Sequence, residues 1–262
     1  MNLLKTALAT LLLGAFTLAA QQPTTPPDKP APQAPPPVSD WERSHQEQLR
    51  TDWPWLARYQ EADVKLAAPA SGENRVVFMG DSITEGWHFE GADGSFPGKP
   101  YINRGISGQT SPQMLVRFRQ DVIALRPKVV VILAGTNDIA GNTGPVSLAE
   151  IEDNFASMAE LARAHGIRVV FSSVIPVHNY TPASAITFPL RPPAQIVALN
   201  RWLKDYAAAN GGVYLDYFAA MIDEHGLLRR ELAGDGLHPT KAGFAIMAPL
   251  AEQAIDRALH GG

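Results

Sequence analysis

Short, continuously apolar runs alternate along the chain with longer stretches in which apolar residues recur at helical spacing. The apolar runs are rich in β-branched residues, as is typical of parallel strands covered on both faces. They lie at 75–79, 129–133, 168–174 and 213–215. The helical patterns lie at 111–125, 148–165, 193–209 and 240–259. Strands that alternate with helices predict a three-layer α/β/α sandwich built around a parallel sheet.

The segment before the first apolar run has the pattern of a helix interrupted by proline. It covers residues 41–66, and Pro54 is expected in the first turn of a second helix that begins at Asp52 or Trp53. The apolar positions expected to face a core are Trp41, Leu49, Trp53, Leu56, Tyr59 and Val64. No internal repeat is visible, so we expect one folded domain over residues 41–262.

The N-terminal stretch differs in composition from the rest of the chain. Residues 1–20 contain one basic residue and then an apolar run over 7–20 that ends in small residues. This layout predicts a signal peptide cleaved after Ala19 or Ala20, and therefore a periplasmic or secreted protein with no stable membrane span. The alternative, a retained membrane anchor, needs an apolar run of about 20 residues. The proline-rich stretch over 21–40 predicts an extended linker.

Composition and charge exclude several classes of function. The chain has no cysteine, which removes disulfides, thiolate zinc sites and cysteine nucleophiles. Its formal net charge is -4 and its basic residues form no run, so no nucleic-acid partner is expected. The histidines show no spacing typical of metal ligands, and the glycine-rich motifs that hold nucleotides are absent from the sequence. We therefore expect neither a metal nor an organic cofactor.

Polar clusters directly follow several of the predicted strands. Gly80-Asp81-Ser82 follows the first apolar run, residues 135–138 follow the run at 129–133, and residues 103–110 follow a short strand candidate at 101–102. In a parallel α/β sheet the carboxyl ends of the strands meet at one edge, where ligands bind. The clusters are therefore predicted to lie close together.

Residues in and beyond these clusters supply the groups that acyl transfer needs: a nucleophile, a base, a carboxylate that orients it, and oxyanion donors. Ser82 is a candidate nucleophile, although a serine at a helix start is also a common N-cap. Asp235 can orient the imidazole of His238 three residues later, although this motif taken alone is better explained as a plain Asp-Gly surface turn. Gly108 and Asn137 can donate N–H groups to an oxyanion, or can simply form turns.

Four motifs, in this order, resemble the blocks of the GDSL or SGNH hydrolases, a family of extracellular and periplasmic esterases and lipases. They are Gly80-Asp81-Ser82-Ile83-Thr84, Gly108 within Ile106–Thr110, Gly135-Thr136-Asn137-Asp138, and Asp235-Gly236-Leu237-His238. The first block ends in Ile-Thr and lacks the eponymous leucine, which is typical of the subgroup that resembles platelet-activating-factor acetylhydrolase. The resemblance covers about residues 74–250.

The resemblance implies a flavodoxin-like fold with a parallel sheet of about five strands, and it implies roles for the motif residues. Ser82 would be the nucleophile, His238 the general base and Asp235 its orienting partner. The backbone N–H groups of Ser82 and Gly108 and the side chain of Asn137 would form the oxyanion hole. Such a site needs no metal or organic cofactor.

Residues that contact the substrate are less clearly marked in the sequence. Trp87 lies just beyond the nucleophile and is predicted to line a pocket, with a place in the core as the alternative. The long loop at 176–193 leaves a predicted strand at the same edge of the sheet and carries His178 and Tyr180. It is predicted to select the substrate, with a plain connector as the alternative.

The sequence thus predicts a serine esterase that hydrolyses short-chain acyl esters, acetyl esters above all. No lid-like apolar insertion is evident, which argues against long-chain lipids. The predicted export and linker are consistent with a small ester, an acetylated glycan or a cell-wall polymer as substrate. The alternatives are a lysophospholipase or thioesterase of the same family, and a non-catalytic carbohydrate-binding module that has kept the fold. The intact set of motif residues favours an enzyme.

Overall fold

The computed structural model describes residues 40–89, 91 and 94–261. The signal peptide predicted over 1–20 and, apart from Asp40, the linker predicted over 21–40 lie outside these residues. Within the described ranges, every helix is too short or too polar to span a membrane.

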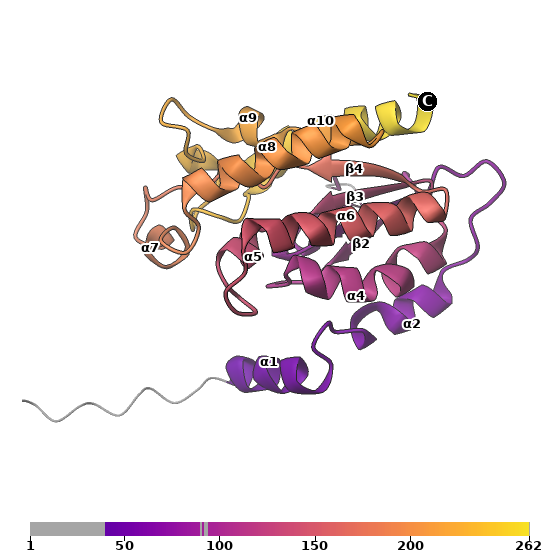
Figure 1. Ribbon diagram of the computed structural model, residues 1–262, viewed down its shortest axis with the longest axis horizontal. Helices are drawn as coiled ribbons and strands as arrows, with labels where there is room; N and C mark the ends of the chain where they lie inside the picture. The colour runs from indigo at the N-terminus through magenta and orange to yellow at the C-terminus, as the bar shows by residue number, and fades with distance from the viewer. Residues whose placement is uncertain (1–39, 90, 92–93, 262) are drawn as a thin grey trace, which may run out of the picture. The chain divides into compact units, whose positions relative to one another are not determined.

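A parallel sheet of five strands forms the middle layer of the fold (Figure 1). The strands are β1 (Val76–Gly80), β2 (Tyr101–Gly105), β3 (Val129–Leu133), β4 (Arg168–Ser172) and β5 (Val213–Leu215). Their order is β2-β1-β3-β4-β5, and Val76 of β1 lies opposite Tyr101 and Val129. Every residue of β1 and β3 is buried, which explains their continuously apolar sequences.

The helices that connect β2 to β5 pack against one face of this sheet. They are α4 (Ser111–Asp121), α6 (Leu148–Ala164) and α8 (Pro193–Ala209). Their crossovers all run in one direction along the sheet, and right-handed connections therefore place the three helices on the same face (Figure 1). The last helix, α10 (Lys241–His260), contacts β3, β4 and β5 and covers the other face. The predicted three-layer α/β/α sandwich is confirmed.

Short helices occupy the loops at the carboxyl ends of the strands. They are α3 (Ser82–Glu85), α5 (Thr136–Ile139), α7 (Ser184–Thr187) and α9 (Tyr217–Met221). Two short 3-10 helices lie elsewhere in the connections: η1 (Ile123–Leu125) follows α4, and η2 (Arg230–Leu232) precedes α10. The labelled helices α5, α7 and α9 lie at the same end of the sheet in Figure 1. α3 follows β1 and α5 follows β3, the two strands between which the direction of winding reverses. Ligands of such folds bind at this position.

Aromatic side chains fill the layer between the sheet and α10. Trp87, in the connection from β1 to β2, stacks on Phe244 of α10 with ring centroids 5.2 Å apart. Phe78 of β1 and Phe96 pack against the same indole, with centroids 5.9 and 5.2 Å away. The Trp87 side chain is 3% exposed, and its N–H donates to Ser95 Oγ at 2.8 Å. The chain directly after α3 is therefore anchored in the core.

The helix predicted over 41–66 is divided into α1 (Asp40–Thr51) and α2 (Ala57–Lys65). The second helix begins later than predicted because Trp55 has a φ of 55°, which no right-handed helix tolerates. The carboxylate of Asp52 then accepts hydrogen bonds from the backbone N–H groups of Leu56 and Ala57, at 2.8 and 2.9 Å.

The prediction that this N-terminal segment buries its apolar residues is wrong for three of the six, whereas Leu49 and Tyr59 are half-buried and the side chain of Trp41 lies outside the described part of the chain. Trp53 and Leu56 are each 38% exposed and Val64 is 82% exposed. The segment is attached to the rest of the fold mainly through polar groups, such as the ion pair between Asp63 and Arg104. Apolar spacing alone therefore overestimated its contact with the core.

Candidate active site

The carboxyl end of β1 places Ser82 at the first position of α3. Asp81 is the N-cap of this helix, and its Oδ1 accepts the N–H of Ile83 at 2.9 Å. The helix can approach β2 closely only because position 105 is glycine: a Cβ there would lie 2.1 Å from the backbone nitrogen of Glu85. Because Asp81 does the capping, the side chain of Ser82 is not needed as a helix cap.

The turn after η2 brings an imidazole to that hydroxyl. Ser82 Oγ lies 2.9 Å from His238 Nε2, and His238 Nδ1 lies 2.6 Å from Asp235 Oδ2. Asp235 Oδ1 also accepts the backbone N–H groups of Leu237 and His238, at 3.0 and 2.8 Å. Partial burial acts to raise the pKa of Asp235, but these hydrogen bonds outweigh it and hold the pKa below its usual value. The carboxylate is therefore ionised and its orientation is set by three bonds.

Backbone N–H groups beside Ser82 are left free for a ligand. Within the described part of the chain, the N–H groups of Ser82 and Gly108 have no hydrogen-bond acceptor. The peptide of Gly108, with φ of 78°, is held by Asn142, whose Nδ2 donates to its carbonyl at 3.0 Å. Ser82, Gly108, Asn137 and His238 all line one cleft of 740 Å³. The residues predicted separately are thus brought together.

The amide of Asn137 is fixed in one orientation by its neighbours. Its Nδ2 donates to the carbonyl of Gln109 at 3.0 Å, and its Oδ1 accepts from Arg191 Nη2 at 3.1 Å. Arg191 also donates from Nε to Thr136 Oγ1 at 3.0 Å and is only 6% exposed. Burial lowers the pKa of Arg191, whereas Asp81 and Asp235 act to raise it. A guanidinium has only donors, so the Asn137 oxygen must face it and the nitrogen must face the opposite side.

Two buried carboxyl groups lie behind these residues. Asp81 is fully buried, and this burial raises its pKa to about 7, although the N–H of Ile83 and the nearby His238 oppose the shift. Asp138 accepts the backbone N–H of Ser111 at 2.9 Å and its hydroxyl at 2.5 Å. Asp138 thereby connects α5 to the start of α4.

The loop over 176–193 holds the turn that carries Asp235 and His238. His178 Nε2 lies 2.7 Å from the carbonyl of Ala233, and its backbone N–H donates to the carbonyl of Gly236 at 3.0 Å. The hydroxyl groups of Thr181 and Thr187 donate to the carbonyls of Gly234 and Asp235, at 3.0 and 2.9 Å. Four successive carbonyls, from 233 to 236, are therefore bound by this one loop.

The residues that the sequence suggested for substrate contact have other places in the structure. Trp87 is in the aromatic core, and His178 is fully buried beneath the Asp235 turn. The hydroxyl of Tyr180 donates to Asp223 at 2.6 Å, and this bond raises the pKa of Tyr180 to about 12. None of the three is among the described residues that line the cleft. Their contacts are in packing and in support of the loops. Neither the position of Trp87 next to the nucleophile in sequence nor the position of His178 and Tyr180 on a loop at the same edge of the sheet brought these side chains to the cleft.

The structure adds residues that sequence reasoning missed. Trp55, Gln48 and Asn142 line the cleft, and Arg191 orients Asn137. Arg191 and Trp55 lay in segments that the sequence had marked, but no motif distinguished them. Among the described residues, no group of His, Cys, Asp and Glu side chains is arranged to hold a metal ion.

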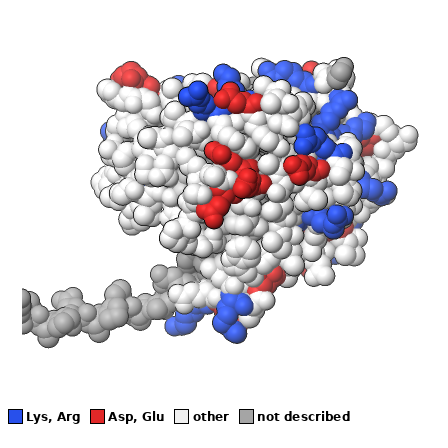
Figure 2. All heavy atoms as spheres, viewed as in Figure 1, with Lys and Arg blue, Asp and Glu red and all other residues white. Residues whose placement is uncertain are grey.

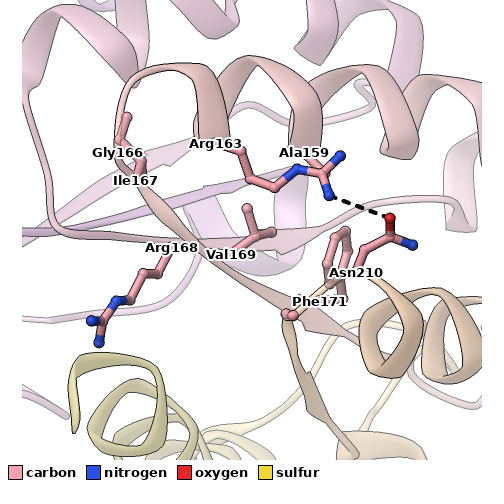
Figure 3. A pocket seen from close by; sticks show the side chains of 10 residues that line it. Ala159, Arg163, Gly166, Ile167, Arg168, Val169, Phe171 and Asn210 are labelled. Atoms are coloured by element: carbon pink, nitrogen blue, oxygen red, sulfur yellow. Dashed lines mark hydrogen bonds between the residues drawn. The ribbon is translucent and has the colours of Figure 1, made fainter. Parts of the chain in front are cut away.

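A second cavity, of 230 Å³, lies at the opposite edge of the sheet, where β4 begins (Figure 3). Arg163 points across it to Asn210, to which it donates a hydrogen bond of 3.3 Å (Figure 3). The described residues that line it include no hydroxyl, carboxylate or imidazole. The cleft at Ser82 is therefore the candidate active site.

The chain is similar to several known proteins. Residues 78–246 match the GDSL-like Lipase/Acylhydrolase family. A structure from Bacteroides fragilis described as an acylhydrolase is 42% identical, with a TM-score of 0.73, over 80% of this chain and 99% of that one. A GDSL-like lipase from Bacteroides thetaiotaomicron is 43% identical, with a TM-score of 0.72, over 79% of this chain and 100% of that one. A variant of an acetyl xylan esterase from Geobacillus stearothermophilus is 25% identical, with a TM-score of 0.58, over 71% of this chain and 96% of that one.

Two curated proteins are also similar over part of their length. The uncharacterized lipoprotein YqeF of Bacillus subtilis is 32% identical over 132 residues, which are 44% of this chain and 54% of that protein. The esterase TesA of Pseudomonas aeruginosa is 30% identical over 141 residues, which are 54% of this chain and 62% of TesA. The matched part of the chain thus spans between half and two thirds of these two relatives.

Proposed function

The chain belongs to the GDSL-like lipase/acylhydrolase family of ester hydrolases, and we propose that it is a serine esterase that hydrolyses short-chain acyl esters, acetyl esters above all. The observation that carries this proposal is the unbroken line of hydrogen bonds from Asp235 through His238 to Ser82, at the wall of a cleft. A hydroxyl bonded to an imidazole that a carboxylate orients is the arrangement that activates serine towards an ester carbonyl.

In the proposed acylation step, Ser82 Oγ attacks the carbonyl carbon of the ester while His238 Nε2 takes the hydroxyl proton. The carbonyl oxygen becomes an oxyanion and accepts hydrogen bonds from the N–H groups of Ser82 and Gly108 and from the amide of Asn137. The bond to the alkoxy oxygen then breaks, and His238 Nε2 gives its proton to the leaving alcohol. Asp235 stays ionised throughout and stabilises the imidazolium.

In the proposed deacylation step, water takes the place of the alcohol. His238 Nε2 removes a proton from water, and the water oxygen attacks the acyl carbon that is bonded to Ser82 Oγ. The same donors bind the second oxyanion. The bond to Ser82 Oγ then breaks, the proton returns from His238 to this oxygen, and the carboxylic acid leaves. The enzyme is restored without any cofactor.

The lining of the cleft supports a short acyl group. Trp55 and Leu237 are the only large apolar side chains among the described residues that line it, and the others are polar residues or glycine. A long acyl chain would cover these polar groups without giving them hydrogen bonds, which is costly. An acetyl group needs room for a single methyl. The acetyl xylan esterase among the similar proteins supports a short acyl group, and the esterase TesA supports ester hydrolysis as such.

We further propose that the protein is exported. The proposal is supported by the basic residue, apolar run and small residues of 1–20 and by the proline-rich stretch over 21–40. One similar protein is named a lipoprotein, whereas this chain has no cysteine that could be lipidated. N-terminal sequencing of the protein recovered from periplasm or medium is expected to start at Ala20 or Gln21. An intact Met1 in the membrane fraction would contradict export by cleavage.

A series of p-nitrophenyl esters tests the proposed chemistry. We expect kcat/KM to be highest for the acetyl to butyryl esters, and Ser82→Ala to lower kcat by about 10⁴-fold or more. A maximum at about eight carbons or longer would overturn the short-acyl proposal in favour of a lysophospholipase or thioesterase. Near-full activity of Ser82→Ala would overturn the proposed nucleophile.

A further inference from the structure

The cleft at Ser82 continues past Gly108 towards the turn between α1 and α2. A smaller pocket of 140 Å³ adjoins it and shares five lining residues with it, namely Gln48, Trp55, Ser107, Gly108 and Asn142. Trp55 thus lines both spaces. A ligand seated with its ester carbonyl at Ser82 can extend along this path and reach the indole.

We infer that Trp55 is the stacking platform for a sugar ring, so that the substrate is an acylated neutral oligosaccharide; this inference rests on the proposed esterase function. The ester carbonyl lies at Ser82, and the sugar that carries it extends over Trp55. Neither the motif residues nor the similar proteins assign a role to this tryptophan.

The backbone of Trp55 has a conformation that bulky residues rarely adopt. Its φ is 55°, and among the described non-glycine residues only Arg126 shares the positive range. Both residues close a turn, at a position where a left-handed residue is a common terminator: the N–H of Trp55 donates to the carbonyl of Asp52 at 2.8 Å, and that of Arg126 to the carbonyl of Ile123 at 3.0 Å. A bulky residue in this conformation is strained. Such a conformation persists only where contacts with the surrounding structure hold the backbone in it. Strained residues of this kind cluster at ligand sites.

Three glutamine side chains supply these surroundings. Gln109, Gln113 and Gln120 donate from Nε2 to the carbonyls of Pro54, Trp53 and Leu56, at 2.7, 2.7 and 2.6 Å. All three glutamines lie on or just before α4, which follows the loop of Gly108. The carbonyls on both sides of Trp55 are therefore bound, and the backbone that carries the indole is held in place before a ligand arrives.

The orientation of Gln109 connects this turn to the candidate active site. Its Oε1 accepts from Nε of the fully buried Arg117 at 2.5 Å, so its Nε2 must face Pro54. Its backbone carbonyl accepts from Asn137 Nδ2 at 3.0 Å. The platform and the proposed oxyanion donor are thus held by the same residue.

The groups around the indole suit a neutral sugar. Ser44, Gln48 and Asn142 line the cleft near Trp55 and offer hydroxyl and amide groups to sugar hydroxyls. The guanidinium of Arg58 lies over one face of the Trp55 ring, 5.8 Å from its centroid, so a sugar would stack on the opposite face; the charge of Arg58 is paired with Glu85 at 3.0 Å. The electron-rich face of the ring attracts the polarised C–H groups on one side of a sugar.

Charge at the cleft argues against an anionic ligand. The positive charge of Arg191 is opposed by the nearby Asp235, and the other guanidinium of the lining, that of Arg58, is paired with Glu85. On the face shown in Figure 2, basic side chains gather towards the end of the sheet where the strands begin, and the opposite end is mostly uncharged. A neutral glycan fits this distribution better than a phospholipid headgroup.

The test compares acetylated xylotriose with p-nitrophenyl acetate for wild-type protein, Trp55→Ala and Trp55→Phe. Trp53→Ala is the matched control, because Trp53 is in the same turn, is 38% exposed and is not among the described residues that line the cleft. We expect Trp55→Ala to lower kcat/KM for the glycan ester, relative to that for p-nitrophenyl acetate, by about ten- to hundredfold, mainly through KM. Trp55→Phe restores most of this ratio, and Trp53→Ala leaves it unchanged.

Binding to the inactive Ser82→Ala protein gives a readout that does not depend on turnover. Calorimetry with acetylated xylotriose is expected to show a Kd for the double variant Ser82→Ala, Trp55→Ala that is about tenfold or more higher than the Kd for Ser82→Ala alone. An unchanged Kd, or an unchanged ratio between the two substrates, would overturn the platform while leaving the esterase proposal intact. A wild-type protein inactive on both esters would instead overturn the esterase proposal.

Discussion

Asp81 is a carboxyl group that the fold keeps away from water next to Ser82. Its burial raises the pKa to about 7, whereas an aspartate in an unfolded chain has a pKa of about 4. Between these values the folded state holds a proton that the unfolded state lacks. The stability that this proton gives is fully present below about pH 4 and is lost as the pH rises through about 7.

We predict that Asp81→Asn raises the free energy of unfolding at pH 8, by at most about 4 kcal/mol, and changes it little at pH 4. An amide keeps the oxygen that caps Ile83 and carries no charge to desolvate. Urea denaturation of both proteins at the two pH values measures this. A difference of equal size at both pH values would contradict the raised pKa.

Arg191 is a positioning residue in this account, because it contacts Asn137 and does not donate to the reacting atoms. We predict that Arg191→Gln lowers kcat for p-nitrophenyl acetate by about 10- to 100-fold and leaves KM nearly unchanged, because a free amide spends less time in the productive orientation. The same substitution in an Asn137→Ala background should cost little more. Full additivity of the two losses would show that Arg191 does not act through Asn137.

The loop over 176–193 acts as one element, because it binds the turn that carries Asp235 and His238 through successive carbonyls. Gly236 is where the two segments come closest. It has a φ of 83°, and a Cβ there would lie 2.4 Å from the carbonyl oxygen of His178. At Gly234, two residues away, a Cβ would meet nothing within 4 Å.

We predict that Gly236→Ala lowers kcat by about 10²-fold or more and destabilises the fold by about 1–3 kcal/mol, because the turn must shift away from the loop. Gly234→Ala is the matched control and should retain activity. Steady-state kinetics and thermal unfolding of the pair measure both effects. Equal behaviour of the two variants would mean that the close contact at 236 does not position His238.

At the scale of the whole molecule, the sheet and the Ser82 cleft were the most predictable parts. Buried strands such as β3 can be predicted from their continuous β-branched residues. Because ligands of such folds bind at the carboxyl ends of the strands, Ser82, Gly108 and Asn137 can then be predicted to lie at one edge of the sheet. The rule does not say how a side chain points. Trp87 therefore turned into the core, whereas Trp55, far from any motif, came to line the cleft.

The parts that were missed depend on contacts between distant residues. Arg191 reaches Asn137 across 54 positions, and Gln113 reaches Trp53 across 60. Bonds from side chains to distant backbone groups leave no period in the sequence, so no local pattern reports them. The same holds for α2, where Val64 is 82% exposed despite its helical spacing, and where long-range polar contacts such as that between Asp63 and Arg104 attach the helix.

The most direct measurement for the central claim is the intact mass of the protein after reaction with a fluorophosphonate. We expect one phosphonyl group per molecule, located by peptide mapping on Ser82, and none on Ser82→Ala. Asp235→Asn should react orders of magnitude more slowly while keeping its fold, because the imidazole loses its orienting partner. An unlabelled wild-type protein, or a label on another residue, would contradict Ser82 as the nucleophile.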